Sequence, residues 1–438
     1  MKLVLTQSIL VLLLLLIATV TAQNEIPPLL KDVAASKASP DVKPPRGELT
    51  LRQALKLALQ HNPQLTVYSL EIRTREAAAL QAALWPNPEL TVDVENFAGS
   101  GALSAFKSNE TTISVGQLFE LAGKRQKRAR VAGLAVESAT YDYRAKQLDV
   151  FTRVVMAFNH VLASQQFVEL NLDLLTLAQE FKENIVRRVK AGRLSPVELS
   201  RADVEVANAR ISLLRSQKTL TAARLGLASI WGATQASFSK VSGNMENVTA
   251  VPRIDRLMNR LTQNPDLARW QVIKKQRLVE QNLARAMRIP DPVINAGWRK
   301  LNESGSQAFV AGLSIPLPFF NRNQGAIQET TVRLKQSAWQ ERFVRLKLQT
   351  LLKQKYQTLL AAYESLQSLK NEIIPQARNA FATINDGYQQ GKFGFLDVLD
   401  ARRTLFASRE AYLRNLKDYH RTRAQIERLI GQSLANVK

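Results

Sequence analysis

The chain has 438 residues, a formal net charge of +23 and no cysteine. Without cysteine it forms neither a disulfide nor a zinc–thiolate site, and it cannot be lipidated on an N-terminal cysteine. The 60 Lys and Arg residues are spread along the chain and form no basic block. This distribution favours solvated helix faces, with some charges attracted to anionic lipid headgroups, and argues against nucleic acid as a partner.

The N-terminus has the pattern of an export signal. A positive Lys2 precedes the nearly continuous apolar run of residues 3–20, and small residues then predict cleavage near Gln23. A membrane anchor is the alternative, but the small-residue end and the polar continuation favour a signal peptide at residues 1–22. The proline-rich residues 23–48 are predicted to form an extended leader.

Residues 49–251 predict a helix, two short strands, a very long helix and a shorter return helix. No proline occurs between Lys124 and Val189, and no glycine follows Gly133 in that stretch, so a helix about 100 Å long is expected at 1.5 Å per residue. The predicted bounds are a helix near 51–84, strands at 89–97 and 111–119, the long helix at 124–190 and the return helix at 196–230.

Residues 252–431 repeat this order, and residues 432–438 form a tail. Pro375 is expected to break or kink the second long helix. The predicted bounds are a helix near 253–287, strands at 292–300 and 307–316, the long helix at 326–390 and the return helix at 395–430.

The two halves are an internal duplication. Residues 192–232 match residues 391–431 at a constant offset of 199, so that Gly192 corresponds to Gly391 and Gly232 to Gly431. Upstream, Asn-Pro-x-Leu and Pro-Asn/Asp-Pro motifs also recur. Repeats of this length indicate an architectural unit that is completed by its neighbours. The expected fold is mainly α with a small β part, and helices this long suit the wall of a tube better than a globule.

The four strands alternate between apolar and polar residues and approach the 9–11 residues of a membrane-crossing β-strand. Ordinary soluble hairpins are the alternative, and the export signal favours the membrane. If the four strands lie in a membrane, their two unpaired edges are not tolerated in hydrocarbon, so oligomerisation is required. The side chains expected on the lipid face are Leu90, Val92, Val94, Trp298, Phe309, Leu313 and Ile315, with Phe97, Phe106, Phe119, Phe319 and Phe320 as interfacial aromatics.

Two tight turns connect the long helices to their return helices, and their glycines permit the backbone conformations that such a helix-hairpin turn needs. Asp397 and Asp400 follow the second turn one helical turn apart, so both can face the same side. They could form an acidic constriction or be ordinary solvated acids near a helix N-terminus. The first half has Glu198 and Arg201 at the matching positions. The turn residues are Gly192, Arg193, Leu194 and Ser195 in the first half and Gly391, Lys392, Phe393 and Gly394 in the second.

Catalysis finds no support in the sequence. The histidines His61, His160 and His420 are widely separated and form no zinc-binding spacing, and neither a nucleophile motif nor a phosphate loop is present. We therefore expect no enzyme activity, no resident metal and no cofactor.

Three stretches together resemble the TolC family of outer-membrane efflux proteins. The first joins Trp85-Pro86-Asn87-Pro88-Glu89-Leu90 to the segment from Gln117 to Arg125. The second is the segment from Leu313 to Gly325, and the third combines Gly387-Tyr388, Gly391 and the segment from Leu396 to Arg403. The Pro-Asn-Pro-Glu-Leu and Phe-Glu-Leu-x-Gly-Lys-Arg patterns are most similar to the CzcC-type heavy-metal branch.

The resemblance implies a homotrimer in the outer membrane of a Gram-negative bacterium, with a twelve-stranded barrel and a periplasmic helical tunnel. It implies a periplasmic adaptor at the turns, an inner-membrane resistance–nodulation–division pump, and a cation gate at Asp397 and Asp400. The expected cargo is a divalent cation of the cobalt, zinc, cadmium or nickel class. Organic drugs or type I secretion remain alternatives, and a periplasmic coiled-coil scaffold is the alternative of a different class.

Overall fold

A computed structural model describes residues 46–434. The predicted signal peptide, residues 23–45 of the leader and the last four residues of the tail lie outside this range. The larger elements are α2 (Leu51–His61), α3 (Pro63–Ala82), β2 (Glu89–Glu95), β3 (Glu110–Leu118), α4 (Lys124–Lys190), α5 (Pro196–Ser229), α7 (Pro265–Ala286), β5 (Val293–Leu301), β6 (Gln307–Ser314), α8 (Gln324–Ser368), α9 (Ile374–Gln389) and α10 (Phe395–Ile430).

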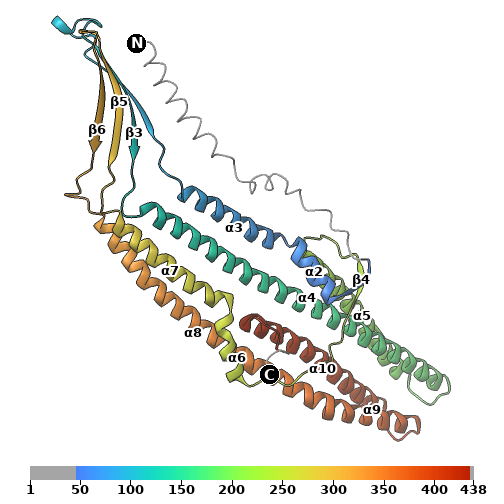
Figure 1. The fold of residues 1–438 in the computed structure, drawn as a ribbon. Helices are drawn as coiled ribbons and strands as arrows, with labels where there is room; N and C mark the ends of the chain where they lie inside the picture. Colours follow the sequence, from blue (N-terminus) through green and yellow to red (C-terminus); the bar gives the residue numbers. More distant parts are fainter. Residues whose placement is uncertain (1–45, 435–438) are drawn as a thin grey trace. The chain divides into compact units, whose positions relative to one another are not determined.

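Two long helical hairpins form most of the described chain (Figure 1). The 67-residue α4 turns back into α5, while α8 and α9 together turn back into α10. A π-helical turn at Leu369–Ile373 separates α8 from α9 and lies just before Pro375. The expected interruption at this proline is therefore present, because proline has no N–H to donate to the preceding turn.

Four antiparallel strands form a sheet of order β2-β3-β5-β6 at the end of the helices (Figure 1). Each repeat supplies one hairpin, β2–β3 and β5–β6, and the central pairing of β3 with β5 joins the two repeats. The strands β2 and β6 are thus the free edges of the sheet in the described chain.

Two strands end earlier than the sequence indicated. β2 stops at Glu95 because Asn96 has a positive φ of 54°, which breaks the ladder geometry. β6 stops at Ser314 because Pro316 and Pro318 follow and cannot donate to a ladder. Ile315, which was expected within the membrane strand, therefore lies just beyond it.

A second, two-stranded sheet was not expected from the sequence. β1 (Gly47–Thr50) pairs in parallel with β4 (Phe238–Ser242). The predicted end of the leader at residue 48 is therefore wrong, because residues 47 and 48 belong to a strand. Strands of four and five residues whose partners lie some 190 residues apart have no local pattern to reveal them.

The helix expected near 51–84 is divided at Asn62-Pro63, and its counterpart near 253–287 is divided into α6 (Ile254–Arg260), a short 3₁₀ turn and α7. The repeated Asn-Pro motif has the same role in both halves. Each asparagine caps the following helix, and its amide donates to the end of the return helix: Asn62 to the Ile230 carbonyl at 2.5 Å and Asn264 to the Leu429 carbonyl at 2.8 Å.

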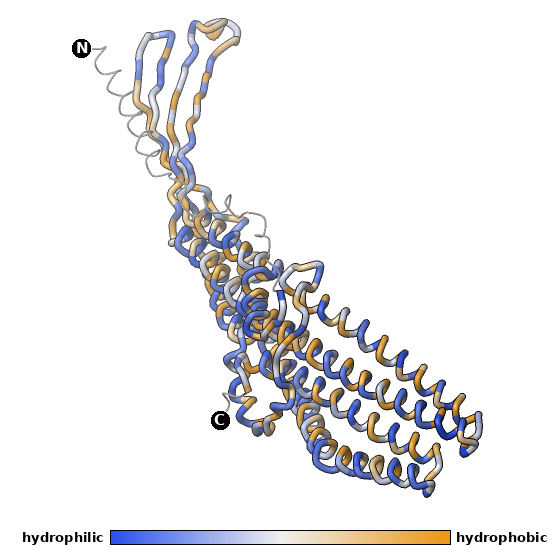
Figure 2. The backbone as a smooth tube through the Cα atoms, turned by 90° about the vertical axis from the view of Figure 1, so that its right-hand side faces the viewer, coloured by the Kyte–Doolittle hydropathy of each residue, from blue (hydrophilic) through white to orange (hydrophobic). Residues whose placement is uncertain are grey.

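The long helix α4 packs against α3, α5, α7 and α10. Figure 2 shows apolar and polar residues alternating along them without long apolar runs. Within residues 46–434, no helix has the length and apolarity required to cross a membrane.

Candidate functional site

Both hairpin tips have the same backbone hydrogen bonds. In the first, Arg193 N–H donates to the Arg188 carbonyl at 2.8 Å, and in the second, Lys392 N–H donates to the Gly387 carbonyl at 2.8 Å. The glycines Gly192 and Gly391 have φ values of 74° and 77°, which terminate the preceding helix. The tip residues are exposed, except that Leu194 packs partly into the core below the turn.

The two tips lie side by side at the end opposite the four-stranded sheet, held by a shared apolar core (Figure 1). This core contains Ile185 from α4, Tyr388 from α9, and Phe395 from α10, and the Phe181 ring lies 5.4 Å from both the Tyr388 and Phe395 rings. Gly387 allows the Phe393 ring to lie against α9, because a Cβ there would approach a ring atom within 2.3 Å. The tips therefore behave as one packed unit within a chain.

Arg188 connects the first hairpin to the end of α9. Its guanidinium donates to the carbonyls of Tyr388 and Gln389, each at 3.3 Å, and lies 4.6 Å from the centre of the Tyr388 ring. A cation at these carbonyls satisfies a helix C-terminus and its dipole. Burial raises the pKa of the Tyr388 hydroxyl, so this ring stays neutral below the tip.

Asp397 and Asp400 are both exposed at the start of α10, but their surroundings differ. The Asp397 carboxylate accepts the Gly394 N–H at 2.8 Å and so caps the helix. Asp400 has no hydrogen bond or ion pair within the described residues. At the matching place in the first hairpin, Glu198 pairs with Arg201 at 3.3 Å. The second hairpin therefore presents a free acid where the first presents a neutralised pair.

An ion-pair cluster that the sequence analysis missed joins the hairpins below the tips. Glu205 of α5 binds Arg402 of α10 at 2.6 Å and also binds Arg403. The Arg402 side chain is only 5% exposed, and its Nε has no partner in the described chain. Burial lowers the pKa of Arg402, while Glu205 acts in the opposite direction. The 199-residue repeat places Thr404 where Glu205 falls, so the duplication carried no signal for this pair.

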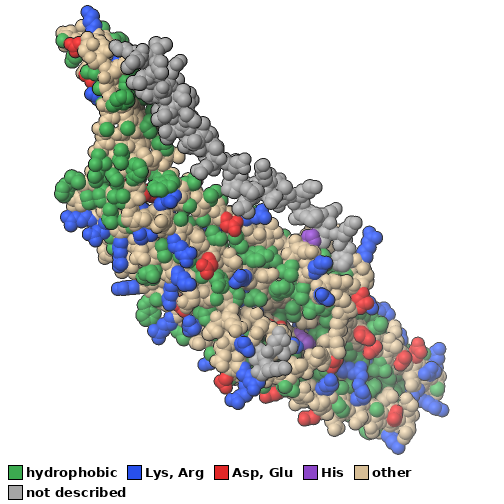
Figure 3. All heavy atoms as spheres, in the orientation of Figure 1, with side chains coloured by type: hydrophobic (Ala, Val, Ile, Leu, Met, Phe, Trp, Pro, Cys, Tyr) green, Lys and Arg blue, Asp and Glu red, His purple; other side chains and the backbone are tan. Residues whose placement is uncertain are grey.

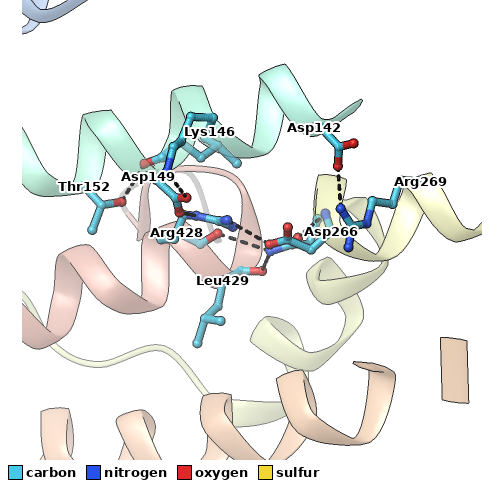
Figure 4. A network of polar contacts seen from close by, with 10 residues as sticks. Asp142, Lys146, Asp149, Thr152, Asp266, Arg269, Arg428 and Leu429 are labelled. Atoms are coloured by element: carbon cyan, nitrogen blue, oxygen red, sulfur yellow. Dashed lines mark hydrogen bonds and ion pairs between the residues drawn. The ribbon is translucent and has the colours of Figure 1, made fainter. Parts of the chain in front are cut away.

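A second polar network joins α4, α7 and α10 farther from the tips (Figure 4). Arg428 donates to Asp149 at 2.6 Å and to Asp266 at 2.8 Å, while Arg269 binds Asp142. Every charged group in this network has an opposite charge beside it, so we interpret it as structural.

The register of the sheet gathers the predicted lipid-facing side chains on one face. Val92, Ile113, Trp298 and Phe309 lie opposite one another across all four strands, and Leu90 and Val94 of β2 have the same parity as Val92. Leu313 is four residues after Phe309 in β6 and so lies on the same face, where it pairs with Ile294. Most of these side chains are exposed, whereas Trp298 is half-buried.

The opposite face of the sheet is polar and carries more acids than bases. Arg299 donates to Thr112 at 2.9 Å and to Glu110 at 3.1 Å, and it lies 3.5 Å from Glu95. Asp93 lies on the same face and is exposed. The sheet thus has one apolar side and one charged side, the pattern of strands between lipid and water.

The described residues contain no group of three or more His, Cys, Asp or Glu side chains placed to hold a metal ion. Two of the histidines have structural surroundings. A ring nitrogen of His420 lies 2.8 Å from the Met245 carbonyl, and burial lowers the pKa of His160, with Lys417 adding to the effect.

The sequence profile of the family described as Outer membrane efflux protein matches the chain over residues 54–233 and 257–432. The cobalt-zinc-cadmium resistance protein CzcC of Cupriavidus metallidurans is 33% identical over 389 residues, covering 88% of this chain and 91% of CzcC. The nickel-cobalt-cadmium resistance protein NccC of Alcaligenes xylosoxydans xylosoxydans is 26% identical over 66% of this chain and 64% of NccC. The crystal structure of CusC has a TM-score of 0.75 at 15% identity, with 90% of this chain and 96% of CusC covered. The chain therefore belongs to the outer membrane efflux protein family.

Proposed function

We propose that this protein is a passive, trimeric outer-membrane channel and the exit duct of a tripartite efflux system that exports divalent heavy-metal cations. The observation that carries the cargo assignment is the 33% identity to a cobalt-zinc-cadmium resistance protein over most of both chains. The proposal includes a periplasmic adaptor, an inner-membrane resistance–nodulation–division pump and no catalytic step.

The free edges of the sheet support assembly from several copies. Within one chain, β3 of the first repeat pairs with β5 of the second. Because the repeats are equivalent, the same junction between two chains places β6 of one copy beside β2 of the next. Three copies contribute twelve strands, which closes the sheet without an unpaired edge in lipid.

Exposed apolar side chains on α8 support the same assembly. α4 is covered by α7 and α10 of the other repeat. α8 is the equivalent of α4, so α3 and α5 of a neighbouring copy should cover it. Trp339, 68% exposed, and Phe343, 67% exposed, lie on the uncovered side of α8, and Val67 of α3 and Ile211 of α5 are similarly exposed. Apolar surface of this extent is typical of an interface.

The tips provide the adaptor contact and the entrance in this proposal. Gly192 to Ser195 and Gly391 to Gly394 are the exposed turns available to an adaptor. Asp400, repeated three times around the axis, forms the acidic ring at the entrance, and Asp397 contributes a second ring while capping α10. Acidic rings of this kind attract cations by the physics of cation-channel filters. Hydrated metal then passes without tight coordination, which would slow its release.

Deleting the gene in its own bacterium tests the cargo. We expect tolerance to cobalt, zinc or cadmium to fall and cellular metal content to rise, with both restored by the wild-type gene. Tolerance to organic dyes and detergents serves as the internal control. Unchanged metal tolerance combined with sensitivity to organic compounds would assign the duct to a different cargo.

A further inference from the structure

Four arginines at the junction of the helices and the sheet have no role in the proposed channel. They are Arg130, Arg285, Arg288 and Arg322, and we call them the basic belt. Arg130 lies about two turns into α4, Arg285 in the last turn of α7, Arg288 just after it and Arg322 just before α8. Since β5 pairs with β3 and β6, and α7 packs against α4 and α8, the four surround one junction.

The basic belt has no counter-charge inside the protein. All four side chains are exposed, and within residues 46–434 none makes a hydrogen bond or ion pair. Nearby acids are instead engaged: Asp291 binds Lys124 at 2.7 Å and Glu120 binds Arg128 at 2.5 Å. Glu89 is a free acid, but it lies on the polar face of the sheet. The junction therefore presents uncompensated positive charge to its surroundings.

A band of exposed apolar side chains lies between the basic belt and the sheet. All four connections between helices and strands contribute to it, and Phe320 is 94% exposed. Figure 3 shows hydrophobic side chains gathered at this junction, with Lys and Arg side chains on the helices next to them. The principal members of this apolar band are Trp85, Phe119, Ile289, Leu317, Phe319 and Phe320.

Helix stability explains only part of the basic belt: Arg285 and Arg288 lie at the C-terminal end of α7, where the helix dipole favours cations. The first turns of α4 and α8 contain no acid, although acids are the residues that favour a helix N-terminus. Arg322 precedes α8, and α4 begins with Lys124-Arg125. A cation just before α8 opposes the helix dipole, so an external anion is the simpler reason for the placement of Arg322.

We propose that the basic belt binds the anionic headgroups of phospholipids in the periplasmic leaflet of the outer membrane, with the apolar band immersed beside their acyl chains. The order along the molecule is apolar sheet face, apolar band and basic belt, which is the order of hydrocarbon, interface and phosphate in a leaflet. This inference rests on the membrane orientation of the proposed channel, in which the sheet crosses the bilayer and the helices lie in the periplasm. Lipopolysaccharide occupies the opposite leaflet and is not the ligand.

The test measures lipid retention by the purified full-length protein in detergent. Native mass spectrometry counts lipids retained from an equal mixture of phosphatidylglycerol and phosphatidylcholine. One charge near an anionic surface changes affinity about fivefold. Because the belt has four arginines, we expect wild-type protein to prefer phosphatidylglycerol at least tenfold. Replacing all four belt arginines with glutamine should reduce this preference below twofold.

The matched control removes four exposed bases that are remote from the junction. Arg187→Gln, Arg210→Gln, Arg215→Gln and Lys218→Gln together should leave the preference unchanged. Equal retention of both lipids by wild-type protein, an equal loss in the control, or displacement of phosphatidylglycerol by lipopolysaccharide would overturn the proposal. Circular dichroism and gel filtration verify that both variants fold. Conductance in a phosphatidylcholine bilayer is measured separately, so failure of the channel is distinguished from failure of lipid binding.

Discussion

Asp400 is an exposed carboxylate that no cation in the described chain neutralises, whereas its neighbour Asp397 holds the first turn of α10. The two acids therefore differ in their hydrogen bonding even though both face solvent at the same tip. Removing the Asp397 charge alters both the entrance and the helix start. Removing the Asp400 charge should alter only the electrostatic potential at the proposed entrance, which makes Asp400 the cleaner probe of the proposed gate.

Asp400→Asn should weaken block of the reconstituted channel by divalent and trivalent cations at least tenfold. The reason is that a trimer loses three charges, each of which attracts a cation by about 1 kcal/mol at contact distance in water. Planar-bilayer conductance at increasing cation concentration measures the effect. Asp386→Asn removes another exposed acid of the same hairpin and should leave the block unchanged. An Asp400 variant that is blocked as strongly as wild-type protein would remove the gate from this position.

At the scale of elements, Glu205 holds two hairpins that belong to different repeats. Its carboxylate binds both Arg402 and Arg403 across the gap between α5 and α10. Breaking a buried pair costs more than the pair contributes, because the remaining charge stays buried without a partner. Separation of the hairpins is therefore opposed by Arg402 as well as by the apolar core at the tips.

Glu205→Gln should destabilise the protein by about 3 kcal/mol, the order expected when one partner of a buried pair is removed. It should also raise open-channel conductance, since the hairpins separate more easily. Thermal unfolding in detergent and single-channel recording provide the two measurements. The control is Asp203→Asn, two residues before Glu205 in the sequence. Asp203 forms an exposed ion pair with Lys182 at 2.6 Å, and breaking it should cost at most about 1 kcal/mol. Equal effects of the two variants would contradict a special role for Glu205.

At the scale of the whole molecule, the two equivalent repeats of the described chain leave β2 and β6 as free sheet edges, which the proposed trimer would pair. Glu89 and Val293 follow the repeated Pro-x-Pro motif and pair with Gly116 and Ser314, respectively. Gly116 in turn lies opposite Asn295 across the junction of the repeats. Since Glu89 and Val293 are equivalent, Gly116 corresponds to Ser314, and Asn295 corresponds to Thr91. If the junction between chains has the same register, Ser314 of one copy lies opposite Thr91 of the next.

Because the chain has no cysteine, Thr91→Cys combined with Ser314→Cys introduces the only two thiols. Opposite residues on adjacent strands have Cβ atoms about 5 Å apart, close enough for oxidation or a short cross-linker. We expect covalent dimers and trimers on a non-reducing gel. Val92→Cys with Ser314→Cys places the first thiol on the other face and should leave monomers. Cross-linking of both pairs to the same extent, or of neither, would contradict the derived register.

Much of the architecture is readable from the amino-acid order. The uninterrupted α4, the interruption near Pro375 and the strands β2 and β5 follow from local residues: the absence of proline, the proline itself and the alternation of apolar and polar side chains. Pairings over long distances are different. The β1–β4 ladder, the Glu205–Arg402 pair and the Arg188 contact with α9 each join residues some 190 or more positions apart, and none repeats between the halves.

The sequence by itself determined the two repeats, their long helices and the family, because periodicity, proline placement and duplicated motifs act within a few turns of chain. It also placed Asp397 and Asp400 on one side of a helix start. Only the tertiary structure separated their roles, paired Glu205 with Arg402 and left the belt arginines without counter-charges. Such partners are decided by which surfaces meet in space, since the free energy of an ion pair depends on burial and distance and not on separation along the chain.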